Sequence, residues 1–140
     1  NVQNMEYNFL LLEGQNLLYD NKSKLCSLNK ESLEILTKEY TLISNTIPHE
    51  NSLVSEIVDL VKNNETIVSF EKVTSALKEI DNDQIVSHLK REDYRKISYP
   101  IITRTDHIKK YLINYSFLFS VDTFLSTSSF QGIELDSWYQ

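Results

Sequence analysis

Glycine, proline and cysteine are all scarce in this sequence, with two glycines, two prolines and one cysteine among 140 residues. Phosphate-binding loops need glycine where a Cβ would clash or where φ must be positive. Gly14 and Gly132 stand alone near opposite ends of the chain, so we expect no glycine-rich nucleotide-binding loop. The single Cys26 cannot close an intramolecular disulfide, which fits a reducing compartment.

Long apolar runs are also missing. No stretch of about 18 apolar residues is present, so we expect no membrane span. The hydrophobic fraction of 41% and the charged fraction of 24% exclude a disordered chain. A length of 140 residues predicts one domain, residues 1–140. The chain begins with Asn1 and carries no secretory signal, so we expect it to be a piece of a longer protein.

The scarcity of turn signals predicts a mainly helical (α+β) domain with little sheet. Apolar residues at helical spacing predict helices over the following ranges: 1–20, 29–43, 52–61, 70–80, 84–89 and 106–125. The β-branched run Thr66–Ser69 predicts a short strand. Residues 95–104 alternate loosely and predict extended chain, with a hairpin that bends near Pro100.

Helix, short strand, helix, turn, helix and hairpin, in that order, form a winged helix, here with a core over residues 52–104. Residues 83–92 would occupy the recognition-helix position. Four stretches carry a closer resemblance: 53–61, 66–70, 85–89 and 94–97. They resemble the carboxy-terminal winged-helix domain of the yeast silent-information-regulator family, which is related to the large subunit of the origin recognition complex.

This resemblance implies a decorated winged helix-turn-helix, with extra helices at both ends and a short β-hairpin. It implies a non-catalytic homodimerisation module of a heterochromatin silencing protein in the nucleus, acting at chromatin such as telomeres. The implied partners are a second copy of the chain and, through the parent protein, other silencing proteins and nucleosomes. Dimerisation would promote the assembly and spreading of silencing complexes, because linking two weak chromatin-binding arms raises their effective concentration. No cofactor and no membrane contact are implied.

Basic residues are concentrated in one part of an acidic chain whose net charge is −6. Residues 88–110 hold seven basic and three acidic side chains, net +4, although they are one sixth of the chain. Four of these cations are candidates for nucleic-acid contact: Lys90, Arg91, Arg95 and Lys96. The pattern favours a solvated face first and a protein-binding face second, and the acidic Glu92 and Asp93 argue against direct DNA reading.

Aromatic residues crowd the last thirty positions, and two interpretations of them remain open. They fill the core and fold the tail back over it, or some of them form an apolar patch for a second copy or, in a heterotypic docking domain, for a partner peptide. For the second interpretation the candidate interface residues are Phe117, Phe119, Phe124 and Trp138.

Catalytic and metal-binding patterns are weak. Cys26 would make a thiol–imidazole pair with His49, His88 or His107, but nothing in the sequence brings them together. The spacing of these residues matches no zinc motif, so we expect no metal site. From the sequence we therefore predict that the chain is not an enzyme.

Overall fold

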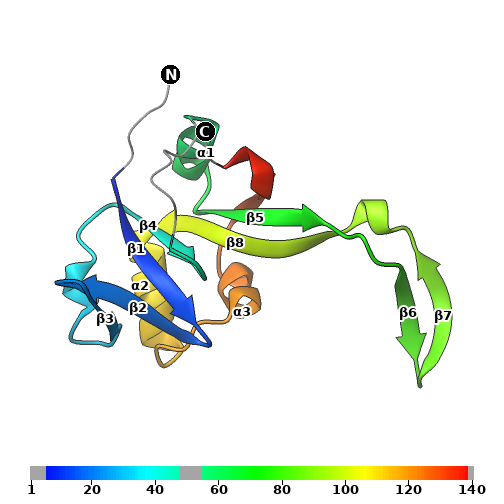
Figure 1. Cartoon of the computed structure of the whole chain (residues 1–140), viewed down its shortest axis with the longest axis horizontal. Helices are drawn as coiled ribbons and strands as arrows, with labels where there is room; N and C mark the ends of the chain where they lie inside the picture. Colours follow the sequence, from blue (N-terminus) through cyan, green and yellow to red (C-terminus); the bar gives the residue numbers. More distant parts are fainter. Residues whose placement is uncertain (1–5, 48–54, 139–140) are drawn as a thin grey trace.

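A seven-stranded mixed sheet is the centre of the molecule (Figure 1). The computed structural model describes residues 6–47 and 55–138. The strands lie in the order β3-β2-β1-β4-β8-β5-β9. Their bounds are Tyr7–Glu13 (β1), Asn16–Asn21 (β2), Lys24–Ser27 (β3), Tyr40–Ser44 (β4), Thr66–Lys72 (β5), Arg95–Arg104 (β8) and Phe130–Glu134 (β9). The expectation of a mainly helical winged helix is therefore wrong.

Both parallel and antiparallel pairs occur in the sheet. β1 runs parallel to β4, and β5 runs parallel to β9, whereas β8 is antiparallel to both of its neighbours, β4 and β5. A parallel neighbour must come from a distant segment because the chain needs a crossover to reach it. No short-range pattern in the sequence therefore predicts these parallel pairings.

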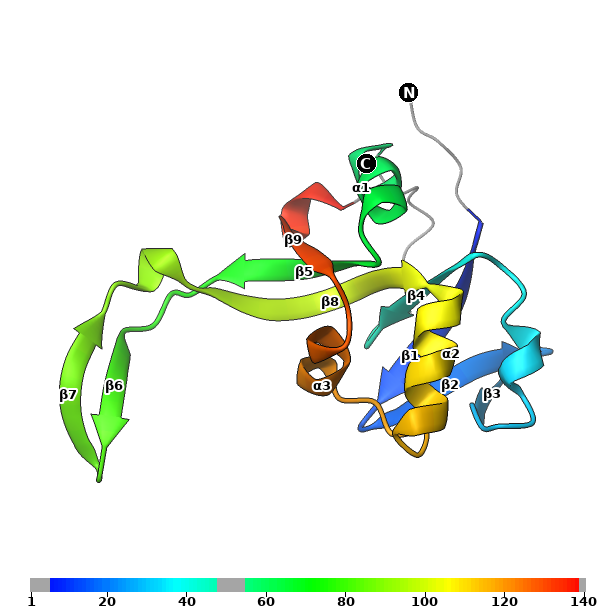
Figure 2. The ribbon, with the colours of Figure 1, turned by 180° about the vertical axis from the view of Figure 1, so that it is seen from behind.

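Helices cover both faces of the sheet, as Figures 1 and 2 show. Three α-helices are described: Ser55–Asn63 (α1), Thr105–Asn114 (α2) and Val121–Ser126 (α3). Three short 3₁₀ helices are also described, in the segments between or after strands: Leu33–Ile35 (η1), Arg91–Asp93 (η2) and Leu135–Ser137 (η3). The helix expected over 52–61 is confirmed as α1, whereas the one expected over 106–125 is divided into α2 and α3.

The core has two halves, one on each side of the sheet. Successive residues of a strand face opposite sides, so Ile67 joins the cluster of α1 while Val68 joins the cluster of α2 and α3. Ile102 and Ile101 are divided in the same way on β8. These strands are buried on both faces and read as continuous apolar runs, which periodicity alone cannot distinguish from helix.

Tight turns without glycine explain why the sequence pattern does not predict the sheet. The β2–β3 turn places Lys22 and Ser23 at φ 54° and 69°, in the left-handed region. Only Gly14, in the β1–β2 turn, supplies the residue type that this region favours (φ 64°). The helices expected over 1–20 and 29–43 are therefore wrong: β1 and β2 occupy most of the described part of the first range, and the second holds only the short η1 (Leu33–Ile35) and the start of β4.

β8 is one continuous strand, so the hairpin expected near Pro100 is wrong, although the extended conformation of 95–104 is confirmed. Proline has no N–H to donate to a ladder and is tolerated at bulges. The register of β5 against β8 shifts between Val68 and Ser69, opposite Pro100. The Ser69 hydroxyl donates to the Pro100 carbonyl at 2.6 Å and so satisfies it.

A two-stranded hairpin of Leu77–Asp81 (β6) and Gln84–Leu89 (β7) projects far from the sheet, as both views show. The helices expected over 70–80 and 84–89 are therefore wrong, and with them the recognition-helix position of residues 83–92. Asn82 and Asp83 close the turn at φ 49° and 63°. Three large apolar side chains of the hairpin are more than half exposed: Ile80, Ile85 and Val86.

Some expectations fall on residues outside the described part of the chain, namely His49 and the first three residues of the 52–104 core. In the described residues, no helix is long and apolar enough to cross a membrane.

Candidate functional site

A basic pocket of about 430 Å³ lies where the β6–β7 hairpin leaves the sheet. It is lined by Lys72, Val73, Thr74, Arg91, Glu92 and Arg95. The lining holds three cations and one carboxylate, so its formal charge is +2 while the whole chain carries −6. Such a concentration of cations in a concave site favours an anionic ligand.

The sheet register explains how these cations meet. Lys72 is the last residue of β5 and Arg95 the first of β8, and the two are partners across the antiparallel ladder. Arg91 arrives on η2, which is the short return from the hairpin to β8. Residues far apart in sequence are thus brought to one wall of the pocket.

Both arginines are held in place by the protein. Nη1 of Arg91 donates to the Thr74 carbonyl at 2.8 Å, and its Nε lies 3.9 Å from Glu92. Nη1 of Arg95 donates to the carbonyls of Glu92 and Tyr94. Side chains fixed in this way lose less conformational entropy when a ligand binds.

The nucleic-acid candidates are only partly brought together. Arg91 and Arg95 line the basic pocket, whereas Lys90 and Lys96 do not. Lys96 follows Arg95 on a strand, where neighbouring side chains point to opposite faces. Contact with nucleic acid through these four residues stays a prediction. Lys72 and Thr74 were missed because neither belongs to the basic segment 88–110.

A second cavity, of about 550 Å³, runs along α2. Helix α2 presents His107, Lys110, Tyr111 and Asn114 to it, at the i, i+3, i+4 and i+7 spacing of one helical face. The remaining lining residues are Glu65, Tyr115 and Thr127. From the sequence, His107 was considered only as the imidazole partner of the Cys26 thiol.

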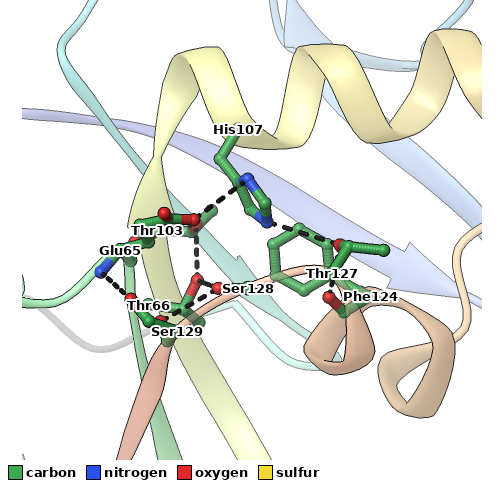
Figure 3. Close-up of polar contacts among 8 residues, drawn as sticks. All are labelled: Glu65, Thr66, Thr103, His107, Phe124, Thr127, Ser128 and Ser129. Atoms are coloured by element: carbon green, nitrogen blue, oxygen red, sulfur yellow. Dashed lines mark hydrogen bonds and ion pairs between the residues drawn. The ribbon is translucent and has the colours of Figure 1, made fainter.

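Three residues from three segments meet at one end of this cavity (Figure 3). Nδ1 of His107 lies 3.3 Å from Oε2 of Glu65, and Nε2 lies 3.5 Å from the Thr127 hydroxyl. The proton of that hydroxyl is donated to the Phe124 carbonyl at 2.7 Å. The imidazole thus lies between a carboxylate and a hydroxyl. These two contacts fix the ring orientation of His107.

A network of hydroxyl groups holds the backbone of Glu65 and ties the start of β5 to Ser128 and Ser129. The Thr66 hydroxyl lies 2.9 Å from that of Thr103 and 2.6 Å from that of Ser128. The Thr103 hydroxyl donates to the Glu65 carbonyl at 3.1 Å, and the Glu65 N–H donates to Ser129. Figure 3 shows these contacts around the start of β5.

The charge of His107 is set by competing effects. Burial lowers the pKa of the imidazole below its usual 6.5, and the nearby Lys110 lowers it further. The Glu65 carboxylate opposes both by favouring the charged form. Burial is the largest of these effects, so the pKa of His107 lies below its usual range.

Three of the four expected interface residues lie in the core. Phe119, Phe124 and Trp138 are at most 2% exposed, and Phe117 is half-buried against the same cluster as Phe119 and Phe124. Trp138 packs with α1 on the other side of the sheet. The burial of Phe119, Phe124 and Trp138 is what the core-filling interpretation expects, and an interface at these rings stays a prediction.

Among the described residues, Cys26 meets neither His88 nor His107. Cys26 lies on β3 at one edge of the sheet, and His88 is exposed on the projecting hairpin at the far end of the molecule (Figure 1). His107 pairs with Glu65 instead. In residues 6–47 and 55–138, no three His, Cys, Asp or Glu side chains form a group that could hold a metal ion.

No protein-family model and no curated protein matches the sequence. Solved structures do match in fold. One is 4-diphosphocytidyl-2C-methyl-D-erythritol synthase from Anaerococcus prevotii, with a TM-score of 0.53, 16% identity and coverage of 74% of this chain and 53% of that one. Another is 2-C-methyl-D-erythritol 4-phosphate cytidylyltransferase from Thermus thermophilus, with a TM-score of 0.50, 13% identity and coverage of 74% and 55%.

The fold is therefore similar to that of these two structures, and this chain spans about half of their length. The resemblance to the silent-information-regulator family is wrong, because its winged helix is absent from the described residues and the matching structures have another fold. The expectations of a non-catalytic silencing module and of nuclear localisation are contradicted with it, since the matching structures are bacterial enzymes.

Proposed function

We propose that this chain is part of a nucleotidyltransferase, and that its basic pocket binds the phosphate group of a phosphorylated small molecule. The observation that carries the proposal is the cluster of Lys72, Arg91 and Arg95 around a concave pocket. The name of the Thermus thermophilus protein supports it, because that enzyme acts on an erythritol 4-phosphate.

The chemistry of the side chains suits this ligand. The planar guanidinium groups of Arg91 and Arg95 donate paired hydrogen bonds that match phosphate oxygens, and Lys72 adds a mobile point charge. In nucleotidyl transfer a phosphate oxygen of the substrate attacks the α-phosphorus of a nucleoside triphosphate, and pyrophosphate leaves. Two anions must approach each other in this step, so cations that hold the substrate phosphate reduce the repulsion between them.

The size of the pocket favours a small molecule over a polymer. A cavity of about 430 Å³ is within the usual range for small-molecule sites. The hydroxyl side chain and backbone carbonyl of Thr74 lie beside Arg91 and provide polar groups for the non-phosphate part of the ligand.

Calorimetric titration with a polyol phosphate, and with the same polyol lacking phosphate, tests the proposal. We expect binding only with phosphate, and a loss of about 10- to 150-fold in affinity for Arg91→Gln, since a hydrogen bond to a charged group is worth about 1.5–3 kcal/mol. Lys78→Gln removes a cation from β6 outside the pocket and is the matched control. Equal binding of both polyols would overturn the proposal.

Nucleic-acid contact, which the sequence suggested, is tested by variants of Lys90 and Lys96. If Lys90 and Lys96 neutralise phosphates of a DNA duplex, changing both residues to glutamine lowers the affinity of the protein for the duplex. The dependence of that affinity on salt concentration also becomes shallower. The small-molecule site does not include them. Competition between duplex DNA and a polyol phosphate for Arg91 and Arg95 would show whether the two ligands share a site.

Self-association also stays a proposal, now at a different surface. Ile80, Ile85 and Val86 are exposed on the hairpin, which stands apart from the sheet (Figure 2). A two-stranded hairpin is only marginally stable in water by itself. Pairing with the same hairpin of a second copy would cover these side chains and place one surface on both partners, as two-fold symmetry requires.

A further inference from the structure

The cavity along α2 is separate from the basic pocket and shares no lining residue with it. Glu65, His107 and Thr127 line one end of it, so an imidazole with two fixed neighbours opens onto a space of about 550 Å³. That volume is within the usual range for small-molecule sites. The phosphate chemistry proposed above gives this group of side chains no role.

The position of the proton on the His107 ring follows from its two neighbours (Figure 3). A carboxylate only accepts hydrogen bonds, so Nδ1, which lies 3.3 Å from Oε2 of Glu65, carries the single N–H of the neutral ring. Nε2 then presents a lone pair. Its neighbour, the Thr127 hydroxyl at 3.5 Å, donates its proton to the Phe124 carbonyl instead. The lone pair of Nε2 is therefore left to accept a proton from a molecule in the cavity.

The ring is held in this orientation by its surroundings. Phe124 packs against it, with 5.1 Å between the two ring centroids. The Glu65 N–H donates to the Ser129 hydroxyl at 3.3 Å, and the Thr103 hydroxyl donates to the Glu65 carbonyl at 3.1 Å, so the backbone that carries the carboxylate is fixed as well. A base that is already oriented in this way requires little reorganisation when a substrate binds.

Two charged groups face His107: Glu65, which directly precedes β5, and Lys110 on α2 itself. Burial lowers the pKa of the imidazole, Glu65 opposes this effect and Lys110 adds to it. The lowered pKa favours the unprotonated ring, which is the form that acts as a base. Lys110 lies three residues beyond His107 on the same helical face, so its ammonium group can stabilise negative charge that develops near the ring.

An aromatic surface lies further along the same cavity. The rings of Tyr111 and Tyr115 stack at 4.7 Å between centroids with an interplanar angle of 21°. The Tyr111 hydroxyl is engaged with the backbone of Ser120, so this ring is fixed. Tyr115 is 44% exposed, which leaves part of its ring surface for a flat group of a ligand. The cavity thus offers a base at one end and a stacking surface for an aromatic group beyond it.

We propose that this cavity is a second active site, in which His107 is the general base for hydrolysis of an aryl ester of a short carboxylic acid. Nε2 takes a proton from water while the water oxygen bonds to the ester carbonyl carbon, and Lys110 stabilises the oxyanion that forms on the carbonyl oxygen. The bond between this carbon and the aryloxide then breaks, and the imidazolium gives its proton to the leaving aryloxide. The products are a carboxylic acid and a phenol, and water is the only co-reactant. Glu65 is a positioning residue that holds the Nδ1 proton and stabilises the imidazolium.

Hydrolysis of p-nitrophenyl acetate by the full chain, followed as the release of p-nitrophenol, tests the proposal. We expect saturable kinetics, and a fall of about 100- to 10,000-fold in kcat/KM for His107→Gln, which is the usual contribution of a general base. His88→Gln removes an exposed imidazole of the hairpin and is the matched control, with unchanged activity. Equal rates for the two variants would overturn the proposal, because the hydrolysis would then not depend on His107.

The pH dependence of the wild-type rate identifies the base without any substitution. We expect kcat/KM to rise with pH through the pKa of His107 in the free protein, which NMR of its ring signals measures. Glu65→Gln should lower kcat with little change in KM and move this midpoint to lower pH, because it removes the anion that raises the pKa. Glu34→Gln, at an exposed position of η1, leaves both unchanged, and circular dichroism confirms that each variant is folded. A midpoint that differs from the NMR value, or that stays in place in Glu65→Gln, contradicts the role of His107 as the base.

Discussion

The Arg95 guanidinium lies over the ring of Phe70, with 5.7 Å between its central carbon and the ring centroid. The other residue that fixes the ring is Gly132 on β9, where a Cβ would come within 2.8 Å of Phe70 Cδ2. Arg95 Nε also lies 3.3 Å from the Glu134 carboxylate. One of the three cations of the basic pocket is thus oriented by β9, the edge strand of the sheet.

Gly132→Ala should destabilise the protein and weaken phosphate binding together. The added methyl group would have to displace the Phe70 ring, and overpacking of this kind costs about 1–3 kcal/mol. Arg95 would lose its cation–π contact, which is worth about 0.5–1 kcal/mol at an exposed site. Thermal denaturation and calorimetric titration with a polyol phosphate measure the two effects.

A second substitution, at Phe70, tests whether the contact between Gly132 and Phe70 causes the loss of stability. Leucine at position 70 is smaller than phenylalanine, so Gly132→Ala combined with Phe70→Leu should be more stable than the sum of the two single changes predicts. Additive losses would mean that the contact between Gly132 and Phe70 does not determine the effect.

Phe124→Ala should unfold or strongly destabilise the chain. The ring is fully buried among Tyr111, Phe119 and His107, and removing a buried phenylalanine costs about 3–5 kcal/mol. Phe130→Ala, at a ring that is 48% exposed, is the comparison and should cost far less. Urea denaturation gives both values. A folded Phe124→Ala variant with unchanged stability would restore the surface interpretation of this ring.

Stability should fall as the pH drops through about 6.5. The pKa of His107 is lower in the folded chain than in the unfolded chain, so below the unfolded value the unfolded state binds the proton more readily. The contribution is fully present above pH 6.5 and is lost as the pH falls towards the folded pKa. Lys110→Met should raise the pKa of His107, because it removes a cation from the cavity. An NMR titration of the ring signals that shows a lower pKa in this variant would contradict the assignment.

Self-association should depend on the hairpin. We expect light scattering to show a dimer, and Ile80→Ser combined with Ile85→Ser to shift it to a monomer without lowering the melting temperature, because both side chains are exposed within one chain. Val73→Ser, at an apolar residue outside the hairpin strands, is the control. A monomer at all protein concentrations would end the proposal.

Sequence patterns located part of the candidate sites. The basic segment 88–110 contains Arg91 and Arg95, and both belong to the phosphate pocket. Lys72 reaches the same pocket only through the pairing of β5 with β8. Likewise, Glu65, His107 and Thr127 come from three segments, and no spacing in the sequence links them.

The sequence by itself determined those elements whose evidence is local: the β-branched start of β5, the extended run of β8, and the helices α1 and α2. The tertiary structure decided the rest. The apolar run of residues 9–12 and the spaced apolar residues of 77–89 suit either a helix or a strand, and only pairing with a neighbour selects the strand. Left-handed turns made by Lys, Ser, Asn and Asp removed the glycine signal. The physical reason is that a strand satisfies its backbone hydrogen bonds with another segment, whereas a helix satisfies them within itself.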